Sequence, residues 1–199
     1  GLPADDRRMD YFCVKEAVMP FGRFPGSDVV LGPEMKSTGE VMGIAGNFPA
    51  AFTKTQLAID YEPPRGGEVF ISVNDGDKRN ITAIARSVAR LGFSLVATTG
   101  TARALRASGI ECEVVGKIHA GSHTILDRIA SGEIVLMINT PFGSSTNTDG
   151  YEMRAACVRH GVSYCTTLAG AQALIAGMEA VRETGLDVIA LQDLPQWEG

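Results

Sequence analysis

Residues 69–92, VFISVNDGDKRNITAIARSVARLG, contain the pattern that decides the fold. The run VFISV at 69–73 is a continuous apolar segment, which is typical of a buried strand. In the part that follows, apolar side chains recur at helical spacing and share one face, and Gly92 ends the helix. These side chains belong to Ile81, Ile84, Ala85, Val88 and Leu91. The stretch therefore predicts a strand followed by an amphipathic helix.

The same strand-then-helix pattern continues to the end of the chain. Further strands are predicted at 93–97, 111–115, 133–139 and 162–166, and helices at 101–108, 123–131, 151–160 and 168–184. Several helices are followed by a glycine, which readily adopts the left-handed conformation that ends a helix. These glycines are Gly109, Gly132, Gly161 and Gly185. The alternation predicts an α/β fold, with a parallel sheet covered by helices on both faces.

Residues 1–60 do not continue this alternation. They contain a strand-like run, YFCVKEAVMPF, then a long stretch rich in glycine and proline, then a helical run, FPAAFTKTQLAI. The segment DYEPPRGGE that follows is polar and holds two prolines and two glycines, which is typical of a linker between domains. We therefore divide the chain into a first unit at 1–60, a linker at 61–68 and a second unit at 69–199.

The composition is that of an ordinary globular protein, with 45% hydrophobic residues and a net charge of −5. Its basic residues form no cluster larger than a pair such as Lys78 and Arg79, which argues against nucleic-acid binding. No apolar run is long enough to cross a membrane, and the four cysteines lack the spacing of a metal site. We therefore expect a cytoplasmic protein with reduced thiols, no metal site, and no nucleic-acid or membrane partner.

Polar residues follow the predicted strands directly. In an open parallel sheet the carboxyl ends of the strands meet at one edge, where ligands bind. At these positions the sequence offers hydroxyl, amide and ammonium groups, and carboxylates are sparse. Hydroxyls and helix N-terminal N–H groups are donors for a phosphate, and lysine supplies the counter-charge. The pattern predicts a phosphate site made by Lys78, the TTGT run at 98–101, Lys117 and Asn139.

Each of these signals also has an ordinary structural interpretation. The run TTGT at 98–101 is equally typical of a helix N-cap preceded by a turn. His119 and His123 flank a glycine, but without neighbouring cysteines or carboxylates they do not predict a metal. Lys15 and Glu16 are neighbours in a predicted strand and therefore point to opposite faces, so only one of them can face a given cleft.

Several stretches resemble the carboxyl-terminal end of the carbamoyl phosphate synthetase large-subunit family, over about residues 11–194. VKEAVMPFGRFPG at 14–26 and LGPEMKSTGEVMGI at 31–44 resemble the end of the second ATP-grasp module of that family. ATTGTA, INT and YCTTLAG resemble its methylglyoxal-synthase-like allosteric domain. The resemblance implies a Rossmann-like, methylglyoxal-synthase-like domain in the second unit, preceded by an incomplete ATP-grasp segment in the first.

That family makes carbamoyl phosphate from bicarbonate, glutamine-derived ammonia and two ATP, for pyrimidine and arginine biosynthesis. The resemblance implies an oligomeric parent ligase that uses ATP with Mg²⁺ or Mn²⁺ and K⁺, and that works with a small glutaminase subunit. The ATP- and metal-binding residues of the family would lie upstream of Gly1. We therefore expect this chain to be a regulatory part that joins the remainder of the large chain, with no catalytic residue or cofactor of its own.

The resemblance also implies two effector sites. UMP or IMP would share a pocket that comprises Ser72, Lys78, Thr98, Thr101, Lys117 and Asn139. Ornithine would bind near the boundary between the units, at Glu16, Tyr164 and Thr166. Two residues depart from the family pattern. Pro141 replaces a threonine and removes a donor from the nucleotide pocket, and Cys165 replaces the aspartate of some relatives, which weakens the case for ornithine.

Two functions of other classes stay open. A methylglyoxal-synthase-type lyase shares the fold but needs a carboxylate base. At the position of the family's catalytic aspartate this chain has Ser122, and Asp149 is the only acid near it in the other loop. A purely structural oligomerisation domain would leave the lysine and threonine cluster without a role.

Overall fold

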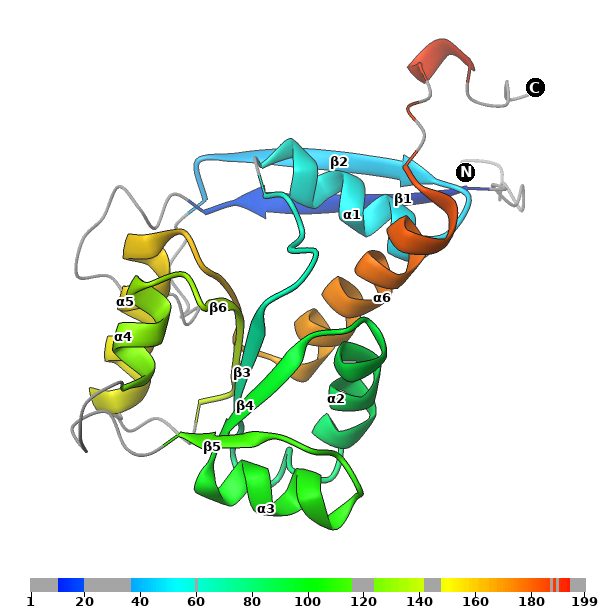
Figure 1. The fold of residues 1–199 in the computed structure, drawn as a ribbon. Coiled ribbons are helices and arrows are strands. Elements are labelled where there is room, and N and C mark those ends of the chain that lie inside the picture. The colour runs from blue at the N-terminus through cyan, green and yellow to red at the C-terminus, as the bar shows by residue number, and fades with distance from the viewer. Residues whose placement is uncertain are drawn as a thin grey trace, which may run out of the picture.

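A five-stranded parallel sheet forms the centre of the protein, and a two-stranded antiparallel sheet lies beside it (Figure 1). This arrangement comes from a computed structural model, which describes residues 11–19, 37–59, 61–115, 124–141, 148–186, 188 and 190–193. Across the large sheet the strands are, in order, β5 (Glu113–Val115), β4 (Ser94–Thr98), β3 (Glu68–Ser72), β6 (Ile134–Asn139) and β7 (Ser163–Cys165). The predicted α/β class is confirmed.

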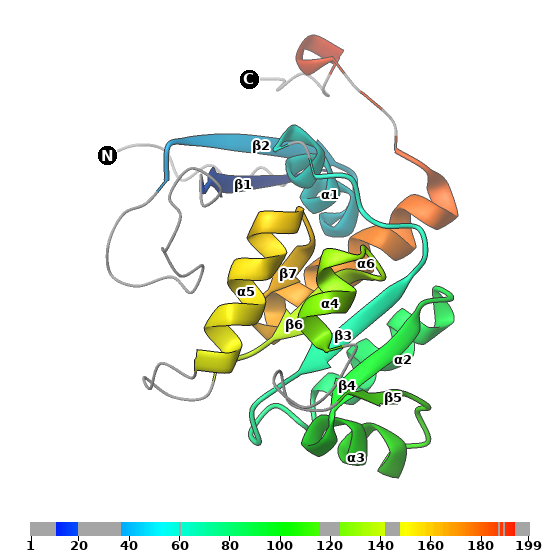
Figure 2. The same ribbon diagram turned by 60° about the vertical axis from the view of Figure 1, so that its left-hand side comes forward.

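Helices cover both faces of this sheet (Figure 2). Successive strand residues alternate between two cores, so that Val69 and Ile71 pack on one face and Phe70 on the other. The first core contains residues of α2 (Ile81–Arg90), α3 (Thr99–Ala107) and α6 (Leu168–Thr184). The second core contains residues of α4 (Ile125–Ala130) and α5 (Thr148–His160). The predicted covering of both faces is therefore confirmed.

Element ends differ from the predicted ones by a few residues. The predicted helix at 101–108 begins at Thr99, because Thr98 has an extended backbone and is the N-cap. The TTGT run is therefore the cap and first turn of a helix, as its structural interpretation predicts. Glu68, the last residue of the predicted linker at 61–68, already pairs in β3. The five predicted helix-ending glycines, Gly92 included, have positive φ, for example 73° at Gly109.

The described part of the first unit is a β-hairpin sheet with one helix on it. Strands β1 (Phe12–Val18) and β2 (Gly39–Ala45) pair in antiparallel register, and α1 (Phe48–Ala58) packs on them. Gly43 makes this packing close, because a Cβ at that position would collide with the carbonyl oxygen of Ala51. Asn47 begins the helix, and its side chain accepts a hydrogen bond from the N–H of Ala50 at 2.9 Å.

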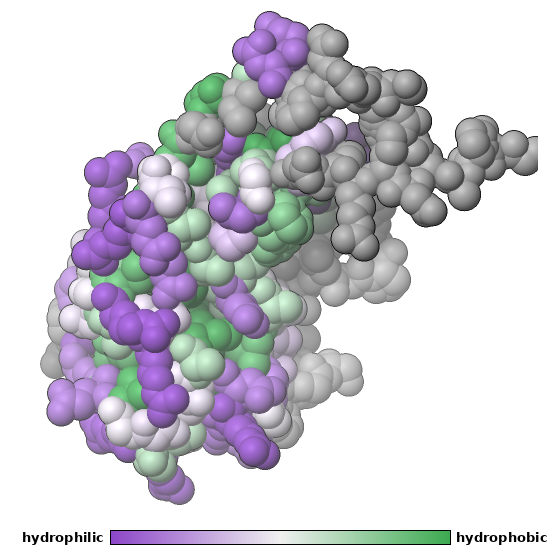
Figure 3. All heavy atoms as spheres, turned by 90° about the vertical axis from the view of Figure 1, so that its right-hand side faces the viewer, coloured by the Kyte–Doolittle hydropathy of each residue, from purple (hydrophilic) through white to green (hydrophobic). Residues whose placement is uncertain are grey.

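Helix α1 also packs on α6, so the two units are in direct contact. Gly177 of α6 permits this approach, since a Cβ there would collide with the hydroxyl of Thr53. An apolar groove of about 640 Å³ lies next to this contact, between α1, the linker and the end of α6. On the side of the molecule where α2 and α6 lie, apolar residues show between hydrophilic ones (Figure 3).

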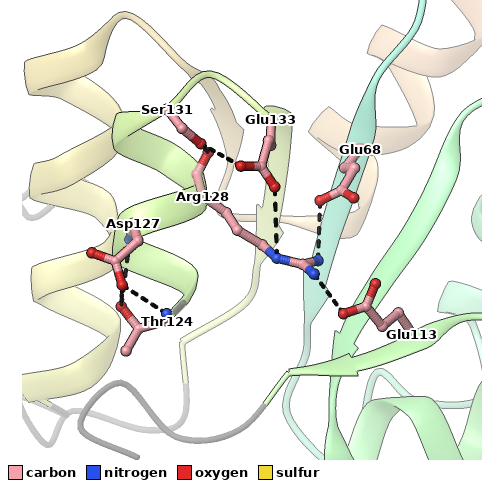
Figure 4. A network of polar contacts seen from close by, with 7 residues as sticks. All are labelled: Glu68, Glu113, Thr124, Asp127, Arg128, Ser131 and Glu133. Carbon is pink, nitrogen blue, oxygen red and sulfur yellow. Dashed lines mark hydrogen bonds and ion pairs between the residues drawn. The ribbon is translucent and has the colours of Figure 1, made fainter. Parts of the chain in front are cut away.

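An arginine joins the strand ends at the edge where β3, β5 and β6 begin (Figure 4). The guanidinium of Arg128 in α4 lies 3.1 Å from Glu68, 2.5 Å from Glu113 and 3.9 Å from Glu133. Burial alone would lower the pKa of Arg128, but the hydrogen bond with Glu113 and the three carboxylate charges outweigh it and raise that pKa. The cluster fastens α4 to three strands at the edge opposite the predicted ligand site.

Candidate functional site

The carboxyl ends of β3, β4 and β6 lie side by side, because β3 pairs with both of its neighbours. Ser72 is the register partner of Asn139, and its carbonyl oxygen accepts a hydrogen bond from Asn139 Nδ2 at 3.1 Å. The same oxygen accepts the N–H of Thr140 at 3.2 Å. The structure thus brings five predicted residues to one edge, and we call them the strand-end site: Ser72, Lys78, Thr98, Thr101 and Asn139.

The two threonines of this site differ in what they can offer a ligand. Thr101 is only 1% exposed, and its hydroxyl oxygen accepts the N–H of Val73 at 3.2 Å. Its role is to hold the β3 end against α3. Thr98 is half-buried, and its side chain makes no capping hydrogen bond to the helix that it precedes. The first turn of α3 therefore has N–H groups that its own cap residue does not satisfy.

Lys78 extends over that same first turn. A Cβ built on Gly100 would lie 3.0 Å from the Lys78 ammonium nitrogen, so the glycine leaves the space that the ammonium group uses. The ammonium also pairs with the carboxylate of Asp75 in the same loop. The expectation that carboxylates are sparse at the strand ends is wrong for this loop, which contains a second carboxylate besides that of Asp75. The second one belongs to Asp77 and accepts a hydrogen bond from the side-chain amide of Asn74 at 2.6 Å.

One charged residue of this region was missed by sequence reasoning. Arg154 of α5 is 6% exposed, and its Nη1 donates to Asn139 Oδ1 at 3.0 Å. The sequence does contain a signal, because Arg154 lies on the same helical face as the buried Gly150 and Cys157. A charged residue within the apolar stripe of a helix indicates a specific buried partner.

Some predicted residues lie outside the described part of the chain. These are Lys117, the two histidines of the same loop, and Ser122. Pro141 is described, is exposed, and directly follows Thr140. As a proline it has no N–H to donate at this position.

The three residues predicted for ornithine line one cavity of about 720 Å³ between β1 and β7. Glu16 points toward α1, where one carboxylate oxygen accepts hydrogen bonds from Thr55 at 2.6 Å and Gln56 at 2.5 Å. Lys15 points the other way and pairs with Glu40 at 2.7 Å. The predicted alternation of these neighbours is therefore confirmed, with Glu16 on the cavity side.

The cavity holds little charge besides that of Glu16. Among the described residues that line it, Glu16 is the one acidic side chain, and there is no lysine, arginine or histidine. Burial raises the pKa of the Tyr61 hydroxyl and of the Cys165 thiol to about 12, so both are neutral near pH 7. Cys165 therefore does not replace the charge of an aspartate.

The described residues contain no group of three or more histidine, cysteine or acidic side chains that would hold a metal ion. Within the same part of the chain, no helix has the length and apolar character needed to span a bilayer.

Comparison with known proteins agrees with this fold. The family model for the MGS-like domain matches residues 80–166, which include most of the strand-end site. The carbamoyl phosphate synthase large chain, C-terminal section, of Methanopyrus kandleri is 51% identical over 195 residues, or 98% of this chain. The carbamoyl phosphate synthase large chain of Myxococcus xanthus is 47% identical over 92% of it. The chain belongs to the carbamoyl phosphate synthase large-chain family.

Within that family the chain corresponds to the carboxyl-terminal, MGS-like section. It spans 36% of the length of the Methanopyrus relative and 17% of that of the Myxococcus large chain. Among solved structures, a methylglyoxal synthase from Elizabethkingia anophelis is 18% identical, with a TM-score of 0.47, over 56% of this chain and 78% of its own.

Proposed function

We propose that this chain is the regulatory carboxyl-terminal section of a carbamoyl phosphate synthase large chain, and that its strand-end site binds UMP or IMP through the phosphate group. In the intact protein the remainder of the large chain would make carbamoyl phosphate with ATP, Mg²⁺ or Mn²⁺, and K⁺. A small glutaminase subunit would supply the ammonia. The first unit would be the end of the second ATP-grasp module. This section would perform no chemical step itself.

The position of Lys78 over the first turn of α3 carries the nucleotide proposal. The N-terminal end of a helix has a partial positive charge, so an ammonium group beside it is unfavourable unless an anion lies close to both. Asp75 supplies one carboxylate to the ammonium, while the first-turn N–H groups receive no bond from the side chain of Thr98. A phosphate group would bind the lysine and the helix end together.

The second effector site is proposed at the cavity between β1 and β7. Glu16 supports it, because its carboxylate is held in place by two donors of α1 and can accept an ammonium group. Cys165 contributes no charge, so ornithine would depend on Glu16 alone among the described lining residues. Binding at either site would act by favouring one arrangement of the two units, typically with about 1–3 kcal/mol of coupling.

Calorimetric titration of the chain with UMP and with IMP tests the proposal. The titration is done at low salt, because salt screens the attraction between the lysine and the phosphate group. We expect saturable one-to-one binding that Lys78→Met weakens by roughly 10- to 100-fold, because a charge-assisted contact contributes about 1.5–3 kcal/mol. Arg79→Met is the matched control, because it removes the same charge from the exposed neighbouring residue. Equal affinity of both variants, or no binding by the unmodified chain, would contradict the proposal.

The same samples discriminate the other functions. Turnover of dihydroxyacetone phosphate would identify a lyase of the methylglyoxal synthase type. Self-association of the chain that neither UMP nor IMP alters, with no nucleotide binding, would favour a purely structural oligomerisation domain.

A further inference from the structure

Arg154 is a buried cation directly behind the strand-end site. It lies on α5, which covers the sheet face opposite α2, α3 and α6. Its Nη1 donates to Asn139 Oδ1 at 3.0 Å, and both residues are 6% exposed. A charge this deep in a protein is costly unless its hydrogen bonds are well formed, so the contact with Asn139 is a specific feature of the fold.

This contact determines which way the amide of Asn139 points. A guanidinium group has donors and no acceptor, so it must meet the amide oxygen and not the amide nitrogen. On the other side, the carbonyl oxygen of Ser72 requires a donor, and Asn139 Nδ2 supplies it at 3.1 Å. Both neighbours therefore select the same orientation. With the oxygen directed at Arg154, the group left for a ligand is the second N–H of the amide.

Gly150 leaves the room in which this contact forms. A Cβ at Gly150 would lie 3.0 Å from Arg154 Nη1 and 3.6 Å from Asn139 Oδ1. The first of these distances is shorter than normal van der Waals contact, so an alanine would push the guanidinium group by a few tenths of an ångström. Helix α5 therefore combines a glycine and an arginine, four residues apart on one face, around the oxygen of Asn139.

We infer that Arg154 is a positioning residue of the strand-end site. It orients Asn139 as a hydrogen-bond donor toward the strand ends. The site thereby favours ligand groups that accept a hydrogen bond at this position, such as the oxygens of a phosphate monoester, over groups that can only donate one. This inference rests on the proposed function, because it assigns the selectivity of the same site.

The test uses the whole chain and three variants of this contact. Arg154→Met removes the charge at similar length, Arg154→Lys keeps the charge without the planar fork, and Gly150→Ala keeps the arginine but displaces it. Arg159→Met is the control, because Arg159 is exposed on the same helix. Calorimetric titrations with UMP and with inorganic phosphate measure affinity, and circular dichroism measures folding. The side-chain amide signals of Asn139 in a ¹H–¹⁵N spectrum report its hydrogen bonds.

We expect Arg154→Met to weaken UMP and phosphate by at least tenfold and to shift the Asn139 amide signals, with part of the affinity restored in Arg154→Lys. Gly150→Ala should weaken both ligands severalfold, and Arg159→Met should stay within twofold of the unmodified chain. If Arg154→Met does not fold, Arg154→Lys and Gly150→Ala decide the question. A folded Gly150→Ala variant with unshifted Asn139 signals and unchanged affinity would overturn this inference but not the proposed function. Failure of the unmodified chain to bind UMP, IMP or phosphate would overturn the proposed function with it.

Discussion

At the residue scale, two arginines show how the same side chain acts at opposite edges of one sheet. Arg128 meets three carboxylates where β3, β5 and β6 begin, while Arg154 meets a neutral amide where β6 ends. In the Arg128 cluster three carboxylates surround one guanidinium group, an arrangement that stabilises the packing of α4 against the strands. Arg154 fixes the orientation of an amide at the edge where the strands end.

Replacing Arg128 with methionine should destabilise the fold. The three carboxylates would lose their shared cation, but Glu113 and Glu133 are 55% and 39% exposed and would be partly solvated. The expected loss is therefore about 1–3 kcal/mol, below the about 3–5 kcal/mol of a fully buried pair. Urea titration at pH 7 measures it. Arg90→Met, which removes an exposed pair with Glu179, should change stability by less than about 1 kcal/mol.

Cys157 should make stability depend on alkaline pH. Its thiol is fully buried in the second core, and burial raises the pKa from 9.0 to about 12. Below pH 9 both the folded and the unfolded state keep this proton, so its contribution is constant. Between pH 9 and 12 the unfolded state releases the proton and the folded state retains it, so stability falls as pH rises.

The comparison of the unmodified chain with Cys157→Ala isolates this effect. In reducing buffer, the free energy of unfolding of the unmodified chain should fall relative to the variant by about 1.4 kcal/mol per pH unit above pH 9. The difference measured at pH 7 and 8 serves as the baseline, because the thiol is protonated in both states there. A difference between the two proteins that stays constant from pH 7 to 10 would disprove the assignment.

At the scale of elements, the starts of the helices differ in how they are capped. Thr124 of α4, Thr167 of α6 and Asn47 of α1 each accept a backbone N–H through the side chain, whereas Thr98 of α3 does not. The sequence shows the same residue type at three of these positions, so it cannot separate a threonine that caps a helix from one that does not. The difference arises because Thr98 lies beside Thr101, with the two hydroxyl oxygens 3.3 Å apart.

The contact between α1 and α6 should be sensitive to one methyl group. Gly177→Ala places a Cβ against the hydroxyl of Thr53, so we expect a loss of about 1–3 kcal/mol in spite of the better helix propensity of alanine. Adding Thr53→Ala removes the oxygen that clashes and should restore most of the loss. Thermal unfolding of the two single variants and the double variant measures the coupling. Additive effects would show that the two residues do not meet in solution.

At the scale of the whole molecule, the two sheets differ in how completely they are covered. β3 has a strand on each side and helices over both faces, and three of its five residues are fully buried. The β1–β2 sheet has α1 on it, but Phe12 and Met42 are 50% and 57% exposed. The described part of the first unit therefore leaves two large apolar side chains half exposed, while β3 leaves none.

Hydrogen exchange should separate the two sheets. We expect the amides of β3 and β6 to exchange most slowly, near the rate set by global unfolding, because they are the most buried part of the sheet. The amides of β1 and β2 should exchange faster by local opening. Peptide mass spectrometry with labelling from seconds to hours measures both regions in one sample. Equal protection of β1 and β3 would mean that the two units unfold as one.

Periodicity of apolar residues is a local property, and it was sufficient to predict from sequence the alternation of strands and helices, the parallel sheet, the glycines that end helices and the residues at the strand ends. The sequence could not predict that β3 and β6 become neighbours, because 60 or more residues separate the paired positions. The Arg154 contact with Asn139, the close approach of Gly177 to Thr53 and the bonds from α1 to Glu16 likewise join residues of separate elements. Tertiary structure decided these features, because each of them exists only when packing brings separate elements within a few ångströms.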